Sequence, residues 1–220
     1  MTFDEQRMSQ PWQDFIAQTL IEEYHGVHVV CGYDFRFGAG GRGNTQVLKE
    51  YCTEKGIGCD IIPPVILNGD RVSSTRIRGL VETGRMEEAY TLLGHPHILQ
   101  GKVVAGRAIG RTLGIPTANL EPNSRRLLPS KGVYAAKAYW ENQCHLAVVN
   151  IGTRPTVEGS HITIEPWILD FSGDLYEKEL TLALYAFLRP EKKFPNLVAL
   201  QQEILRNAEE TREYFKTHPI

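Results

Sequence analysis

The stretch GVYAAKAYW, residues 132–140, decides the fold of the second half of the chain. It is a short, apolar, partly alternating run, and clusters of glycine, proline, asparagine and aspartate separate it from similar runs. Those runs are HILQGKVVAG (97–106), CHLAVVNIG (144–152), HITIEPWILDF (161–171) and ELTLALYAFL (179–188). Such spacing is typical of antiparallel strands that form a barrel or a sandwich. This half of the chain is therefore predicted to be all-β.

Helical patterns flank these strands on both sides. A final helix is predicted over residues 196–215, and an earlier helical pattern covers residues 75–94 and ends at Gly94. One face of the earlier pattern carries Met86, Ala89, Tyr90 and Leu93. Because the periodicity changes after Gly94, we expect two domains, over residues 1–94 and 95–220.

The first domain is predicted to be α/β. Residues 11–25 have helical spacing, and residues 27–37 form an apolar, β-rich run that ends in glycines. A second helix is expected over 44–56, capped by Asn44, and it leads into a strand over 59–67 that two prolines interrupt. The order resembles a βαβ unit.

Composition excludes several function classes. The chain has 220 residues, 42% of them hydrophobic, and 24 Lys plus Arg against 26 Asp plus Glu. A formal charge of −2 gives no general attraction to nucleic acid or to an anionic membrane, so any phosphate ligand must be held locally. No apolar run approaches the ~20 residues that span a bilayer, and the N-terminus has no signal-peptide pattern. We expect a cytoplasmic protein.

The four cysteines predict reduced thiols rather than a metal site. Cys31, Cys52, Cys59 and Cys144 show no CxxC pair and no disulfide framework of a small secreted domain. Their spacing also lacks the pattern of zinc ligands. This agrees with a cytoplasmic location.

One glycine-rich run matches a dinucleotide-binding pattern only weakly. GAGGRG, residues 38–43, fits G-x-G-x-x-G, and Asp60 follows at a plausible distance for a ribose contact. The large aromatics of the preceding GYDFRFG disfavour the tight turn into a helix that this motif requires. No P-loop motif occurs in the chain.

The strongest candidate site is GRTLGIPTANL, residues 110–120. Thr117 and Asn119 are two residues apart, so in an extended segment their oxygens point the same way. Uncharged oxygen donors suit Mg²⁺ whose other ligands are phosphates and water. Gly106 to Gly114, with Arg107 and Arg111, could supply N–H groups and positive charge to an anion. A solvated hairpin turn and an Asx or ST turn are the alternatives.

Glu165 is a candidate general base. It lies in an otherwise apolar, β-branched run, where an ionisable group needs a reason to be present. The alternative is a strand-edge residue that points to solvent. Asp170 and Asp174 are expected to serve a turn.

Seven motifs along nearly the whole chain carry a family resemblance. They are GYDFRFG, SSTRIR, GRTLGIPTANL, KGVYAAKA, NIGTRPT, IEPWILDFSGDLY and FLRPEKKF, in that order. The chain thereby resembles bacterial bifunctional riboflavin kinase/FAD synthetases. The resemblance implies a partial Rossmann-like nucleotidyltransferase domain over 1–94. Over 95–220 it implies a riboflavin kinase module, an antiparallel β-barrel with a C-terminal helix. That module transfers the γ-phosphoryl group of ATP to the riboflavin 5′-hydroxyl and yields FMN and ADP.

The resemblance also implies roles for individual residues. Thr117 and Asn119 would hold Mg²⁺ and phosphates, and Glu165 would accept the hydroxyl proton. The loop that contains Gly106, Gly110 and Arg111 would close over the nucleotide, and residues 150–156 would form a flavin-side loop. Arg189 is left with two roles, contact with the flavin or closure of the barrel against the last helix.

The chain departs from the family in its first domain. The His-x-Gly-His element that binds ATP phosphates is not found, and HGVH at 25–28 has the wrong order. The motif SSTRIR retains Ser74, Thr75 and Arg78, which would otherwise help to hold phosphates near the start of a helix. We therefore expect adenylyl transfer from ATP to FMN to be lost, and self-association through an unpaired sheet edge. A working FAD synthetase and a non-catalytic module that binds flavin and nucleotide are the alternatives.

Overall fold

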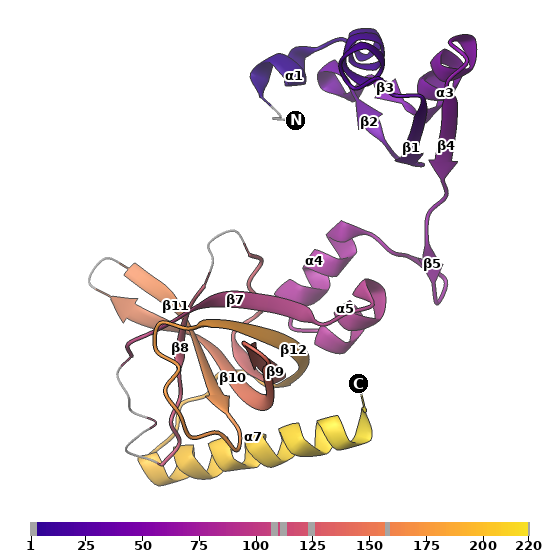
Figure 1. Ribbon diagram of the computed structural model, residues 1–220. Helices are drawn as coiled ribbons and strands as arrows, with labels where there is room; N and C mark the ends of the chain where they lie inside the picture. The colour runs from indigo at the N-terminus through magenta and orange to yellow at the C-terminus, as the bar shows by residue number, and fades with distance from the viewer. Residues whose placement is uncertain (1–3, 107–109, 111–113, 123–125, 157–158, 220) are drawn as a thin grey trace. The chain divides into compact units, whose positions relative to one another are not determined.

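The computed structural model describes residues 4–106, 110, 114–122, 126–156 and 159–219. The chain divides into two compact units, Met1–Val72 and Ser73–Ile220, which we call the N-terminal unit and the barrel unit (Figure 1). Among the described residues, no helix is both long and apolar enough to cross a membrane.

The N-terminal unit contains the predicted βαβ arrangement. Strand β1 (His28–Gly32) pairs in parallel with β4 (Gly58–Ile62), and α3 (Thr45–Glu54) lies between them in the chain. The Asn44 side chain caps α3, because its Oδ1 accepts hydrogen bonds from the backbone N–H groups of Gln46 and Val47 at 2.9 and 3.1 Å. The expected cap is confirmed.

The first helical segment differs from the prediction of one helix over 11–25. It consists of α1 (Glu5–Ser9), a single turn α2 (Trp12–Asp14) and a π-helix, η1 (Phe15–Glu23). The wider π-helical turn still buries one side of the segment, where Ile16 and Thr19 have no appreciable exposure. The helical spacing thus predicted a helical segment here but not its type.

The run GAGGRG forms a tight hairpin rather than a strand-to-helix turn. It joins β2 (Arg36–Phe37) to β3 (Gly43–Asn44) through a short 3₁₀ turn, η2 (Ala39–Gly41). Gly38 has φ 70°, and a Cβ there would lie 2.6 Å from the Cα of Trp12. These glycines therefore serve the hairpin and its packing. A second small hairpin, β5 (Ile66–Leu67) with β6 (Asp70–Arg71), follows β4.

The small parallel sheet has exposed apolar residues. Val30 of β1 and Ile62 of β4 are 60% and 49% exposed, and Val27, just before β1, is 83% exposed. A parallel sheet normally has both faces covered, so Val30 and Ile62, which the register places on one face, mark an uncovered apolar surface. Self-association through this surface stays a prediction.

All four cysteines are free thiols, and burial raises the pKa of Cys52 to about 11.

The helical pattern over 75–94 belongs to the barrel unit. It is broken into α4 (Ser74–Glu82) and α5 (Met86–Leu93) at Gly84, which has φ 76°. A Cβ at Gly84 would lie 2.5 Å from Ser130 Oγ, so the break also permits close packing on the barrel. The helices bury Leu80, Val81, Met86 and Ala89 in the barrel core. The compact units consequently divide at 72/73, earlier than the predicted boundary at 94/95.

Six antiparallel strands close into a barrel, so the sandwich alternative does not apply. Their order around the barrel is β10-β11-β8-β7-β12-β9 (Figure 1). The strands are β7 (His97–Val104), β8 (Asn119–Pro122), β9 (Gly132–Trp140), β10 (Gln143–Thr156), β11 (Gly159–Ile168) and β12 (Glu179–Arg189). Apolar side chains fill the inside, among them Leu99, Leu120, Ile151, Ile164, Leu182 and Leu184.

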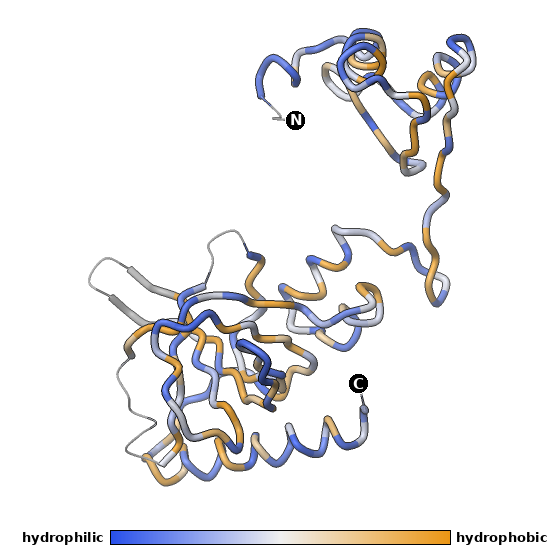
Figure 2. The backbone as a smooth tube through the Cα atoms, in the orientation of Figure 1, coloured by the Kyte–Doolittle hydropathy of each residue, from blue (hydrophilic) through white to orange (hydrophobic). Residues whose placement is uncertain are grey.

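The last helix, α7 (Leu197–Thr217), packs on the outside of the barrel against β9 and β10. Asn196 caps it by accepting a hydrogen bond from the Ala199 N–H at 2.8 Å. Figure 2 shows apolar and polar residues alternating along α7, as expected for a helix with one covered face. A second apolar cluster lies outside the main core and consists of Val133, Val148, Leu169 and Ala208.

Replacing Leu184 with alanine lowers the free energy of unfolding by about 2–5 kcal/mol, because the buried side chain leaves a cavity in the barrel core. Urea denaturation, followed through the unfolding transition of the barrel unit, measures this loss of stability. The matched control is Leu205→Ala on α7, where the side chain is 47% exposed and the cost is below about 1 kcal/mol. Equal losses in both variants would contradict the assigned core.

Candidate active site

Three polar side chains form a row across neighbouring strands of the barrel. The pairing of Leu120 with Ile164 places Asn119 of β8 opposite Glu165 of β11, and Asn150 of β10 pairs with Glu165 from the other side. A hydrogen bond from the Ala118 N–H to the Pro166 carbonyl, 2.9 Å, continues this register. We call Asn119, Glu165 and Asn150 the outer polar row, because the residues next to them in each strand point into the core.

A cleft of about 370 Å³ lies between this face of the barrel and α7. Its apolar lining comes from both sides, with Val133, Val148 and Trp167 on the strands and Leu200 and Ile204 on α7. Its polar lining includes Thr117, Asn150, Glu165 and Glu191. The cleft thus has an apolar wall suited to an aromatic ring and a polar part that contains two carboxylates.

Glu165 faces this cleft and is half-buried rather than fully open to solvent. Burial raises the pKa of its carboxyl group above the ordinary glutamate value. A hydrogen bond from Thr163 acts in the opposite direction, and the negative charge of Glu191 raises the pKa further. A carboxyl group with a raised pKa is a stronger base when ionised than an exposed glutamate.

Gly110 packs closely against Ile115 and Thr117. The Ile115 N–H donates to the Gly110 carbonyl at 2.8 Å. A Cβ at Gly110 would lie 2.1 Å from the Ile115 carbonyl oxygen and 3.2 Å from Thr117 Oγ1, so only glycine fits this turn without a shift. The structure therefore brings Gly110, Thr117 and Glu165 to one cleft.

Asn119 packs closely against Gly106. A Cβ at Gly106 would lie 1.9 Å from Asn119 Nδ2, so the amide rests on the glycine backbone. Asn119 is adjacent to Glu165 in the outer polar row but does not line the 370 Å³ cleft. Arg111, the remaining predicted nucleotide-binding residue, lies outside the described residues.

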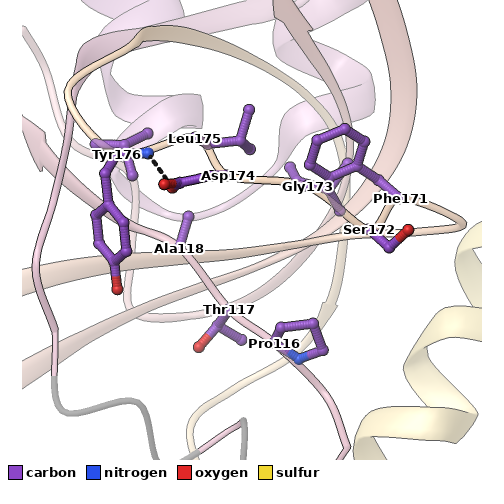
Figure 3. Close-up of a pocket in the computed structure, with 11 residues that line it drawn as sticks. Pro116, Thr117, Ala118, Phe171, Ser172, Gly173, Asp174, Leu175 and Tyr176 are labelled. Carbon is purple, nitrogen blue, oxygen red and sulfur yellow. Dashed lines mark hydrogen bonds between the residues drawn. The ribbon is translucent and has the colours of Figure 1, made fainter.

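Thr117 also lines a second pocket, of about 90 Å³ (Figure 3). Figure 3 shows Pro116–Ala118 on one side of it and the loop Phe171–Tyr176 on the other. Asp174 Oδ1 accepts a hydrogen bond from the Tyr176 N–H at 2.9 Å, which confirms its predicted role in a turn. Among the described residues, Thr117 alone lines both the pocket and the cleft.

Arg189 joins the barrel to α7. Its Nε donates to Asn207 Oδ1 at 3.0 Å and lies 3.2 Å from Glu203 Oε1. Lys192 Nζ lies 2.7 Å from the same Glu203 oxygen. Burial lowers the pKa of Arg189 from its ordinary value. The closing role is thus present in the structure, and Arg189 also lines the cleft, so the flavin-contact alternative stays open.

Sequence reasoning missed Trp167, Glu191 and the α7 residues as parts of the site. Glu191 lies two residues after the end of the buried strand β12, in the run RPEKKF, and an acidic residue so close to a buried strand was the available signal. Its meaning depends on the neighbouring strands and helix, which the local sequence does not reveal.

Comparisons with known proteins agree with this architecture. A riboflavin kinase family model matches residues 93–215, and an FAD synthetase model matches residues 1–76. Two curated relatives are bifunctional riboflavin kinase/FMN adenylyltransferases. The protein from Listeria monocytogenes is 34% identical over 214 residues, which cover 95% of this chain and 68% of the relative. The protein from Escherichia coli K12 is 36% identical, with coverages of 97% and 68%.

A solved structure also matches the chain. It is described as a macrolide-efflux protein from Streptococcus pneumoniae, with a TM-score of 0.88 and 33% identity. The match covers 96% of this chain and 67% of that one, so it includes both units. On the family-model match and the curated relatives, the chain belongs to the family of bifunctional riboflavin kinase/FMN adenylyltransferases.

Proposed function

We propose that the chain is an ATP-dependent riboflavin kinase that transfers the γ-phosphoryl group of ATP to the 5′-hydroxyl of riboflavin. The observation that carries this is the position of Thr117, which lines both a cleft containing Glu165 and a separate pocket. A transfer between two substrates requires two adjoining sites that meet where the group moves. The geometry at Thr117 supports that arrangement.

Riboflavin is proposed to lie in the 370 Å³ cleft. Its isoalloxazine ring is planar and aromatic, and the dimethylbenzene part of the ring matches the apolar wall of Val133, Val148 and Trp167 together with the α7 side chains. Its hydroxylated ribityl chain matches the polar part of the cleft, where Glu165 and Asn150 lie side by side. ATP is then placed on the other side of Thr117, toward the pocket beside the Phe171–Tyr176 loop.

Thr117 and Asn119 fit a magnesium ion that is shared with ATP phosphates. Both supply uncharged oxygens, and the absence of a Cβ at Gly106 and Gly110 leaves the backbone close to these two side chains. A bound Mg²⁺ would neutralise phosphate charge. Two protein ligands with the rest from phosphates and water are typical of magnesium sites in phosphotransferases.

Glu165 is proposed as the general base. Its carboxylate takes the proton of the 5′-hydroxyl as that oxygen forms a bond to the γ-phosphorus, while the bond from phosphorus to the β–γ bridging oxygen breaks and ADP leaves. Phosphoryl transfer depends chiefly on positioning and charge neutralisation, so one placed carboxylate is sufficient for the proton.

The raised pKa of Glu165 predicts the pH dependence of kcat/KM for riboflavin. The base must be ionised, so activity is present above its pKa and is lost as the pH falls through it. Burial raises this pKa, so the acid limb lies above the ordinary glutamate value. Glu191 adds to the shift, whereas the nearby cations Arg189 and Lys192 are paired with Glu203. Initial rates across the pH range measure the limb, with ATP binding followed in parallel; a limb at or below that of an exposed glutamate would refute this assignment.

Product analysis tests the proposed function. Purified protein is incubated with riboflavin, ATP and Mg²⁺, and the flavins are separated by chromatography. FMN is the expected product. FAD in addition to FMN would support the bifunctional alternative, since an FAD synthetase model matches residues 1–76. Absence of both products, with riboflavin still bound, would support the non-catalytic alternative.

A further inference from the structure

Glu191 occupies a specific place in the cleft that the proposed mechanism does not use. It lies two residues after Arg189, at the end of β12, and lines the same cleft as Glu165. A Cβ built at Gly152 of β10 would lie 2.3 Å from Glu191 Oε1. The carboxylate of Glu191 therefore rests on the Gly152 backbone, in space that any larger residue at 152 would fill.

The surroundings of this carboxylate are polar. Gly152 pairs with Thr163, and Asn150 pairs with Glu165, so all four positions share the outer face of the barrel. The Asn150 Nδ2 atom lies 3.6 Å from the same Cβ position at Gly152. A hydroxyl, an amide and two carboxylates thus gather in one part of the cleft.

The charges near Glu191 leave it available for a ligand. The flanking cations Arg189 and Lys192 both pair with Glu203 of α7. Among the residues whose side chains the structure describes, no cation forms an ion pair with Glu191 within 4 Å. A neighbouring carboxylate, Glu165, makes the local charge more negative. Neutral hydrogen-bond donors, rather than anions, suit such a place.

On these observations we infer that Glu191 recognises the ribityl chain, its carboxylate accepting hydrogen bonds from the secondary hydroxyls and so positioning the terminal hydroxyl against Glu165. The inference rests on the proposed function, because it concerns the same flavin substrate. Two carboxylate oxygens can accept from two adjacent hydroxyls at once, and charge-assisted hydrogen bonds of this kind are roughly twice as strong as neutral ones. Glu191 is in this account a positioning and specificity residue.

Binding of two flavins separates this role from a structural one. Lumiflavin has the same ring system as riboflavin and carries a methyl group in place of the ribityl chain. Quenching of flavin fluorescence, without ATP, measures both affinities. Glu191→Ala is expected to weaken riboflavin binding by about 10- to 100-fold and to leave lumiflavin binding within about twofold of wild type. Glu87→Ala on α5, an exposed glutamate outside the cleft, is the matched control and changes neither affinity.

Gly152→Ala tests the same contact without removing the charge. The added Cβ displaces the Glu191 carboxylate, so riboflavin binding weakens selectively again. Equal weakening of riboflavin and lumiflavin by Glu191→Ala would overturn the inference, because the residue would then support the cleft as a whole. Unchanged riboflavin binding would overturn it as well.

Failure of the inference is distinguishable from failure of the proposed function. The proposed function fails if the wild-type protein makes no FMN from riboflavin and ATP. The inference fails if the wild type makes FMN while Glu191→Ala does not discriminate riboflavin from lumiflavin. As a kinetic readout, Glu191→Ala raises KM for riboflavin by about the same factor as the dissociation constant, and KM for ATP stays near wild type.

Discussion

Replacement of Glu165 by glutamine lowers the turnover number for FMN formation by roughly 10²–10⁴-fold, the range that a positioned general base contributes. Glutamine has nearly the same shape and keeps hydrogen-bonding groups toward Thr163, so the cleft is preserved. It cannot accept the proton of the 5′-hydroxyl. Steady-state kinetics with saturating ATP and riboflavin measure the loss, and calorimetry shows MgATP binding within about twofold of wild type.

A matched change elsewhere on the barrel serves as the control for Glu165→Gln. Glu179 is an exposed glutamate at the start of β12, so Glu179→Gln removes the same charge outside the cleft and leaves turnover unchanged. Near wild-type turnover in Glu165→Gln would remove Glu165 from the mechanism. Loss of MgATP binding together with turnover would instead assign the residue to the nucleotide site.

Thr117→Val and Asn119→Ala each weaken MgATP binding and lower kcat/KM for ATP by at least about 10- to 100-fold. Groups that merely orient metal ligands cost this much when mutated, so removal of a ligand oxygen should cost no less. Valine keeps the shape of threonine and removes only the hydroxyl that adjoins Gly110. Riboflavin binding without ATP is expected to change little in Asn119→Ala, since Asn119 does not line the cleft.

The barrel offers matched controls for both changes. Thr181 on β12 accepts a hydrogen bond from Gln100 outside the site, so Thr181→Val leaves ATP kinetics unchanged. Asn142 is exposed between β9 and β10, so Asn142→Ala is the control for Asn119→Ala and also leaves ATP kinetics unchanged. ATP affinity that is equal in wild type and in both site variants would rule out the proposed metal and phosphate ligands.

The strands of the barrel could be predicted from local sequence because each is a short apolar run between turn residues. The pattern did not distinguish a barrel from a sandwich, since closure depends on which strands pair, as β8 does with both β7 and β11. It predicts a domain boundary at 94/95, whereas the compact units divide at 72/73. Gly84 breaks the helical pattern over residues 75–94 into α4 and α5, and the attachment of these helices to the barrel depends on tertiary packing of Met86 and its neighbours.

The candidate site could be predicted in part, for a physical reason. Thr117 and Glu165 are unusual residues in their local patterns, so the sequence alone singles them out, and the family resemblance assigns them a shared site. Their common cleft follows from the pairing of β8 with β11. Glu191 could not be predicted, because its position over Gly152 of β10 depends on tertiary packing. The α7 side chains could not be predicted either, because their position depends on where α7 packs against β9 and β10.

The N-terminal unit shows the same division between local and tertiary information. The Asn44 cap and the helix that follows it depend on a few adjacent residues and agree with the prediction. The π-helical geometry of Phe15–Glu23 was not predicted, because the apolar spacing of this segment is also compatible with an α-helix. The glycines at 38–43 fit a known motif in spacing and serve a hairpin in the structure.

A structure of the protein with riboflavin, Mg²⁺ and a non-hydrolysable ATP analogue tests the central claim most directly. The flavin ring is expected in the cleft beside α7, and the triphosphate is expected at Thr117 and Asn119. A Glu165 carboxylate oxygen is expected about 2.6–3.2 Å from the 5′-oxygen, within reach for proton transfer. A 5′-oxygen beyond hydrogen-bond distance of Glu165, with the γ-phosphate away from Thr117, would contradict it.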